Sequence, residues 1–165
     1  MIAITTVEMI VRVAVALGLG ALLGLERTFA GKRAGMRTYA MVSLGSAVFI
    51  LISENVIAIY GNPSVISPLA LASSVISGIG FIGAGLLIFH TPDNKVTGLT
   101  TAAGLWVAAG IGIAAGFGFF TLALIGAISA LIVFLLFWFI ERGFLKFSRH
   151  MNIDDFDHEN GVKNK

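Results

Sequence analysis

The stretch FGFFTLALIGAISALIVFLLFWFI, residues 117–140, decides the fold class of this chain. It contains no Asp, Glu, Lys or Arg. An α-helix rises by about 1.5 Å per residue, so a helix over this stretch is long enough to cross a hydrocarbon core of ~30 Å. Lipid is the solvent that suits such a surface, because its apolar side chains gain nothing from water. The stretch therefore predicts a membrane-spanning helix.

Four further apolar runs precede this stretch, and each reaches the ~17 residues that a spanning helix needs. They cover residues 9–25, 38–60, 66–89 and 99–115. Of the 165 residues 57% are hydrophobic and only 12% are charged, whereas soluble domains carry about 25% charged residues. We predict an all-α bundle of about five transmembrane helices over residues 1–142, followed by a polar cytoplasmic tail over residues 143–165.

The basic residues give the bundle an orientation, because cytoplasmic segments of membrane proteins collect Lys and Arg. With the N-terminus outside, only Arg12 of the eleven Lys and Arg residues lies outside. The cytoplasmic segments then hold Arg27, Lys32, Arg33, Arg37, Lys95, Arg142, Lys146, Arg149, Lys163 and Lys165. The sequence thus predicts an outside N-terminus and a cytoplasmic tail, as expected for a multi-pass protein of an inner (cytoplasmic) membrane.

Composition also argues against several classes of function. The formal net charge is only +2 and the basic residues lie beside apolar runs, so we expect no nucleic-acid partner. The absence of cysteine removes disulfides, thiol catalysis and thiolate zinc sites. His90 and Asp93 stand in a loop without further ligands, and the acidic residues 154–159 lack the Gly and Glu spacing of an EF-hand. We therefore expect no metal site, no cofactor and no catalytic residue.

Small residues recur along the spans at helical spacing. Examples are Ala16, Gly20 and Gly24, and further along Gly104, Ala108 and Gly112. Small side chains let helix backbones approach closely in lipid, where little else drives association. The expected helix-packing residues are Gly20, Gly24, Gly78, Gly80, Gly83, Gly85, Gly104 and Gly112. These stripes indicate packing within one protomer, or alternatively a homodimer interface or a close ligand passage.

The glycine pattern of residues 77–85, SGIGFIGAG, is not a dinucleotide fingerprint. Such a fingerprint needs a preceding strand, a following helix and a downstream acidic residue, and a continuous apolar run supplies none of these.

Polar residues at the ends of the spans need partners. Glu26 is costly if buried unpaired, so we expect it to pair with Arg37 or with Arg27. Glu8 and Arg12 are four residues apart and are expected to pair along the helix surface without a function. Glu54 is expected to be solvated at the outer end of the second span. Thr97, Thr100 and Thr101 are expected to cap the fourth span or to face a polar cavity, and Trp106 and Trp138 to face lipid or the interface.

Several motifs in order resemble the MgtC/SapB family of bacterial membrane proteins. They are GLER (24–27), AGMRT (34–38), GSAVF (45–49), SGIGFIGAG (77–85) and GLTTAAGLW (98–106). The family often has Arg or Lys where this chain has Thr97, and longer members carry an ACT-like C-terminal domain, so the chain is similar to members with the membrane domain alone. By this resemblance the functional candidates are Glu26, Arg27, Gly35, Arg37, Thr38, Thr100 and Thr101.

The resemblance implies an inner-membrane protein linked to magnesium limitation, acid stress and virulence-type survival, in some members through inhibition of ATP synthase. We expect a non-enzymatic protein that regulates ATP synthase or another membrane protein within the lipid bilayer. The alternative is a small Mg²⁺ or proton transporter or channel. The spans offer only Glu26 and Glu54 for Mg²⁺, which prefers octahedral oxygen ligands, and these two lie near opposite faces.

Overall fold

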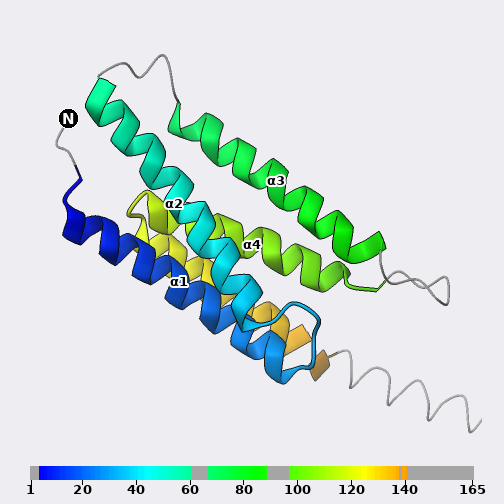
Figure 1. The fold of residues 1–165 in the computed structure, drawn as a ribbon. Helices are drawn as coiled ribbons and strands as arrows, with labels where there is room; N and C mark the ends of the chain where they lie inside the picture. The colour runs from blue at the N-terminus through cyan, green and yellow to red at the C-terminus, as the bar shows by residue number, and fades with distance from the viewer. Residues whose placement is uncertain (1–3, 61–66, 89–96, 138, 141–165) are drawn as a thin grey trace, which may run out of the picture. The chain divides into compact units, whose positions relative to one another are not determined.

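The computed structural model describes residues 4–60, 67–88, 97–137 and 139–140, and apart from short caps and turns these residues are helical. The labelled helices are α1 (Thr6–Phe29), α2 (Met36–Tyr60), α3 (Pro68–Ile88) and α4 (Leu99–Gly116) (Figure 1). A further helix, Phe120–Phe137, follows α4. Among the described residues, five helices are thus long and apolar enough to cross a membrane. The predicted fold class, an all-α membrane protein, is confirmed.

The first helix is longer than the apolar run that predicts it. It begins at Thr6 because the Thr5 side chain accepts a hydrogen bond from the Glu8 amide at 3.2 Å. A side-chain acceptor at this position satisfies an amide that has no partner within the helix. At the other end the helix continues through Phe29, beyond the last apolar turn. Helix ends are set by such local hydrogen bonds, which apolar periodicity does not report.

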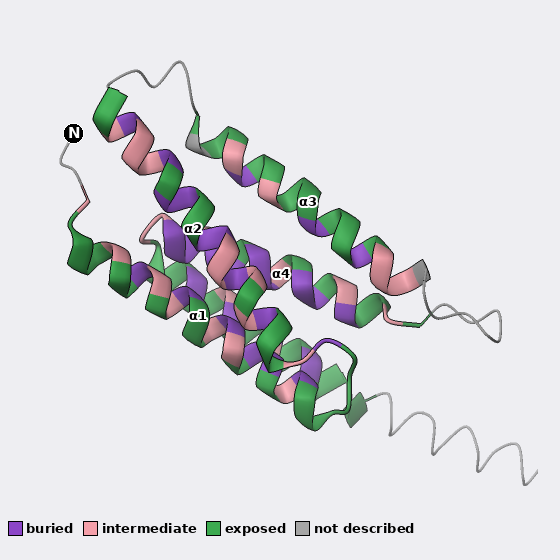
Figure 2. Ribbon diagram, in the orientation of Figure 1, coloured by how far each residue is buried: buried purple, intermediate pink, exposed green. Residues whose placement is uncertain are grey.

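The closest packing joins α1, α2 and α4 (Figures 1 and 2). The buried apolar residues between these helices are mostly small or branched. They include Ala16, Leu23, Ala47, Ile50, Leu105, Ala108, Ala109 and Ala115. By contrast α3 packs chiefly along α4 and has few buried residues, as the green and pink faces in Figure 2 show. The core of this part of the chain therefore lies where α1, α2 and α4 meet, and Ala123 and Ala127 of the helix Phe120–Phe137 are buried as well.

Four glycines let these three helices approach at backbone distance. A Cβ atom on Gly20 would lie 2.7 Å from the Ser43 Cβ, and one on Gly24 would lie 2.5 Å from the Met36 Cα. A Cβ on Gly112 would overlap the Ser43 carbonyl group, and one on Gly116 would lie 2.9 Å from the Ile50 Cβ. At these positions glycine is required by the neighbouring helix.

The glycines of α3 have a different environment. A Cβ on Gly83 would make an ordinary contact of 3.5 Å with the Ala102 Cβ. A Cβ on Gly78, Gly80 or Gly85 would meet no described atom within 4 Å. Their spacing resembles that of packing glycines, but within the described part of this chain no helix lies against these three.

A tight turn joins α4 to the helix Phe120–Phe137, as the glycines at 116 and 118 predict. The Phe119 amide donates to the Ala114 carbonyl at 2.8 Å, and Gly118 has a φ of 79°. This left-handed conformation favours glycine because it has no Cβ. Gly98, with a φ of 94°, is the N-cap residue of α4, so none of the three expected threonines occupies that position.

The chain divides into two compact units, Met1–Ala130 and Leu131–Lys165. Within the second unit the structure describes residues 131–137 and 139–140, which are helical, and Phe134 is buried there. The remaining expectations for this region and the loops lie outside the described residues: those on His90, Asp93, Lys95, Trp138, Arg142 and the tail 143–165.

Candidate functional site

The C-terminal end of α1 carries a buried ion pair. Arg27 donates from Nε to Glu26 Oε2 at 2.6 Å and from Nη2 to Glu26 Oε1 at 3.1 Å. Arg27 is only 3% exposed, and the Glu26 side chain is 15% exposed. Of the two partners expected for Glu26, the structure shows Arg27, and the pairing with Arg37 is wrong. A two-point contact of this kind fixes both side chains, and the charges neutralise each other in a weakly solvated place.

The connection from α1 to α2 is held by Thr28. Its hydroxyl donates to the Gly24 carbonyl and accepts from the Met36 amide, both at 2.9 Å. A Cβ on Gly35 would lie 2.5 Å from this hydroxyl, so the glycine is needed for the turn to close. Gly35 was predicted from its motif, whereas Thr28 was missed because a threonine between two motifs has no distinctive spacing.

The other candidates from the motifs lie nearby but do not meet in one cluster. Arg37 and Thr38 are exposed at the start of α2. Thr101 is buried in the first turns of α4, and its carbonyl accepts from the Tyr39 hydroxyl at 3.3 Å. Thr100 is exposed. The structure therefore brings Thr101 to α2 through its backbone.

Two buried residues of α2 were missed from the sequence. Tyr39 is fully buried, and Ser43, also fully buried, donates to the Ala16 carbonyl at 2.7 Å. They lie four residues apart, on the same face of α2. A tyrosine and a serine on one face of an otherwise apolar span were the available signal.

We expect the substitution Arg27→Met to destabilise the protein, whereas Arg37→Met leaves its stability within about 0.5 kcal/mol of the wild type. The first change leaves the Glu26 carboxylate without the guanidinium beside it, which costs about 3 kcal/mol when a pair is buried. Thermal unfolding of the purified protein in detergent measures both. Equal midpoints for the two variants would contradict a structural pair at Glu26 and Arg27.

A second charged cluster lies at the opposite end of α1. Arg12 donates to Glu54 of α2 at 2.7 Å, to Glu8 at 2.5 Å and to the Gly116 carbonyl at the end of α4 at 2.7 Å. The Arg12 side chain is 10% exposed, while those of Glu54 and Glu8 are 25% and 46% exposed. We call Glu8, Arg12 and Glu54 the Arg12 cluster. One guanidinium thereby joins three helices.

The Arg12 cluster corrects two expectations. Arg12 and Glu8 do pair four residues apart, but Arg12 is buried among helices and does not lie on the surface. Glu54 is not a solvated helix end, because it binds Arg12. The sequence did not reveal this, since the partners are 42 residues apart. Trp106, as expected of a lipid-facing residue, is 54% exposed.

Within the described residues, no three His, Cys, Asp or Glu side chains are grouped so that they could hold a metal ion. The buried carboxylate and guanidinium groups are instead used in the two pairs described above. The arrangement can fix helices at both ends of α1, and the charges of Glu26 and Arg27 cancel each other.

Comparison with known proteins places these features in a family. Residues 13–143 match the profile of the MgtC family. The chain is 34% identical over 135 residues to the Escherichia coli K12 protein named "Putative magnesium transporter YhiD", covering 78% of this chain and 60% of YhiD. It is 37% identical over 130 residues to protein SrpB of Synechococcus elongatus, covering 73% of this chain and 70% of SrpB.

The MgtC protein of Salmonella typhimurium is 45% identical over 85 residues, which cover 52% of this chain and 33% of MgtC. The chain thus spans less than two thirds of the length of YhiD and MgtC. No solved structure matches it. Because the family profile covers residues 13–143 and the described residues contain five helices apolar enough to cross a membrane, the chain is a multi-pass membrane protein that belongs to the MgtC family.

Proposed function

We propose that this protein regulates another protein of the bacterial inner membrane, such as ATP synthase, during adaptation to low magnesium or acid stress, and that it has no catalytic activity of its own. The supporting observation is the close packing of α1, α2 and α4 between the Glu26–Arg27 pair and the Arg12 cluster, which lie at the two ends of α1. There Gly20 and Gly112 bring their helices against the backbone of α2 around Ser43. A protein that acts by contact needs such a rigid core and no passage through it.

Two buried hydroxyls of α2 in this middle region are already used. The Ser43 hydroxyl donates to the Ala16 carbonyl, and the Tyr39 hydroxyl donates to the Thr101 carbonyl of α4. Mg²⁺ prefers six oxygen ligands and gives up its waters reluctantly. Two hydroxyls bonded to backbone, between helices in direct contact, are a poor match for such an ion.

Magnesium or proton transport is the second candidate. The printed name of the Escherichia coli relative refers to magnesium transport. In addition, the Arg12 cluster has two carboxylates and one guanidinium, so one carboxylate charge in it is not cancelled. A transport path would have to run elsewhere than between α1, α2 and α4.

Reconstitution into liposomes tests the choice. We expect that liposomes with this protein alone take up no more Mg²⁺ and no more protons than empty liposomes. When ATP synthase is incorporated with it, ATP-driven proton pumping should change, and the two proteins should co-purify. An unrelated five-helix protein at equal density serves as the control. Mg²⁺ or proton flux that Glu26→Ala or Glu54→Ala abolishes would instead support transport and overturn the regulatory proposal.

A further inference from the structure

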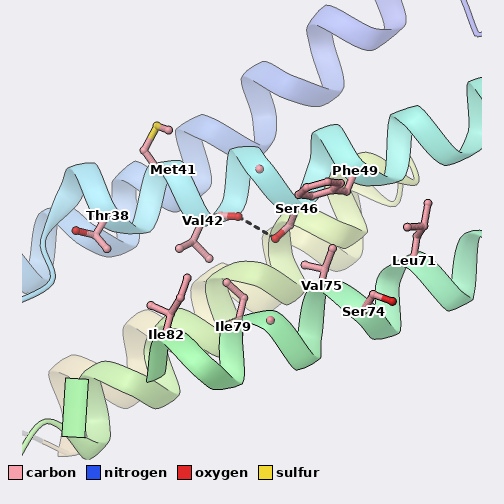
Figure 3. A pocket seen from close by; sticks show the side chains of 12 residues that line it. Thr38, Met41, Val42, Ser46, Phe49, Leu71, Ser74, Val75, Ile79 and Ile82 are labelled. Carbon is pink, nitrogen blue, oxygen red and sulfur yellow. Dashed lines mark hydrogen bonds between the residues drawn. The ribbon is translucent and has the colours of Figure 1, made fainter. Parts of the chain in front are cut away.

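An apolar groove of about 590 Å³ runs between α2 and α3 and opens to the surroundings of the bundle (Figure 3). Thr38, Val42 and Phe49 line it from α2, and Leu71, Ile79 and Ile82 line it from α3. Both helices are apolar enough to span a membrane, so the groove lies where lipid chains surround the protein. Its occupant is therefore to be sought in the bilayer.

The two serine hydroxyls along the groove are satisfied within their own helices. Ser46 donates to the Val42 carbonyl at 2.8 Å, and Ser74 donates to the Ala70 carbonyl at 3.0 Å. Beyond Thr38 at one end, the wall of the groove is otherwise apolar. Such a wall suits a hydrocarbon chain, which has no polar groups to satisfy.

The dimensions also suit a lipid chain. From Thr38 to Phe49 the helix rises by about 16 Å, close to half of the ~30 Å hydrocarbon core. The groove thus has the length of one leaflet, which matches a single acyl chain lying along α2.

One end of the groove is basic. Thr38, at the start of α2 in Figure 3, follows the exposed Arg37, and the preceding loop exposes Lys32 and Arg33. Among the described residues none of these three cations forms an ion pair with a carboxylate. Cations at the edge of a membrane attract anionic headgroups, and arginine in addition binds phosphate at two points.

We propose that the α2–α3 groove holds an acyl chain of an anionic phospholipid, whose phosphate binds Arg37 and Arg33. In the predicted orientation this lipid belongs to the cytoplasmic leaflet. The bound chain fills the space between α2 and α3 and so completes a bundle that α3 alone leaves open. This proposal does not depend on the regulatory function, since it concerns only the lipid that surrounds the protein.

Native mass spectrometry of the full chain in detergent tests the lipid site. The protein is mixed with phosphatidylglycerol or with phosphatidylcholine of the same acyl chains, and the bound lipid is counted. We expect preferential retention of phosphatidylglycerol, reduced about fivefold by Arg37→Gln and further by the double change with Arg33→Gln, which follows from ~1 kcal/mol per basic residue near a lipid surface. Phosphatidylcholine retention should hardly change in these variants.

Filling the groove supplies the second test. Gly45 and Gly78 line it, and a Cβ on either meets no described atom within 4 Å, so Gly45→Leu or Gly78→Leu fills the groove without a clash at the backbone. Either change should lower retention of both lipids at least fivefold. Gly80→Leu, also on α3 with open space around it but outside the groove lining, is the matched control and should retain wild-type binding.

Equal retention of the two lipids, or wild-type retention in the Gly45→Leu and Gly78→Leu variants, would overturn the proposal. So would a dimer that is lost in these two variants and kept in Gly80→Leu, because the groove would then hold a second copy of the chain. Circular dichroism and gel filtration establish that each variant is folded before its lipid is counted.

Discussion

Replacing Gly112 by alanine is expected to destabilise the protein by about 3 kcal/mol or more. The added methyl group would overlap the carbonyl group of Ser43 on α2. Insertion of a methyl group into a close-packed interior typically costs about 1–3 kcal/mol, and the larger cost applies when the obstacle cannot rotate away. Backbone is such an obstacle, because moving it would also disturb the Ser43 bond to Ala16. The helices would have to separate.

Gly110, on the same helix, provides the matched control. A Cβ at Gly110 meets no described atom within 4 Å, so Gly110→Ala should leave stability unchanged or raise it slightly, since alanine is the better helix former. Thermal unfolding in detergent, followed by the fraction that remains monodisperse, compares the two variants. Similar midpoints for Gly112→Ala and Gly110→Ala would show that α2 and α4 do not meet at backbone distance.

Replacing Arg12 by methionine should have an effect of comparable size, about 3 kcal/mol. Methionine keeps an apolar stem but removes the guanidinium that Glu54 and Glu8 share, and it leaves the Gly116 carbonyl without that donor. Breaking a buried pair typically costs about 3–5 kcal/mol, and the partial exposure of both carboxylates places this case at the lower end.

The partners of Arg12 should show graded effects. Glu54→Gln is expected to cost more than Glu8→Gln, because Glu54 is the less exposed of the two and joins α2 to α1. In a double-mutant cycle, Arg12→Met with Glu54→Met should destabilise less than the sum of the single changes. Arg33→Met, at an exposed arginine, serves as the control for lost charge. Additive effects of Arg12 and Glu54 would rule out their pairing as a stabilising contact.

The family motifs predicted part of the candidate site and left part of it out. Glu26 pairs with Arg27, one of its two expected partners, at the end of α1, and Gly35 lies against Thr28 in the turn to α2. The motifs did not reveal the Arg12 cluster, because Arg12 and Glu54 come from helices whose neighbourhood depends on packing. The sequence around a charged residue near the end of a predicted span is the same whether its side chain is solvated or paired with the carboxylate of another helix.

The contacts of the glycines likewise could not be predicted from their spacing. Gly20, Gly24 and Gly112 meet neighbouring backbone, while Gly78, Gly80 and Gly85, with similar spacing, have open space around them in the described structure. Spacing places small residues on one face of a helix, but which face meets a neighbour depends on how the helix is rotated.

By itself the sequence determined the fold class, the approximate extent of the spanning helices and the family, since these follow from apolar length and from local motifs. Only the tertiary structure decided that Glu26 binds Arg27, that Arg12 joins α1, α2 and α4, and that α2 and α3 leave a groove between them. The physical reason is the separation along the sequence of the residues that interact. Helix formation in lipid depends on residues within a few turns, whereas ion pairs, backbone contacts and grooves depend on residues brought together from distant helices.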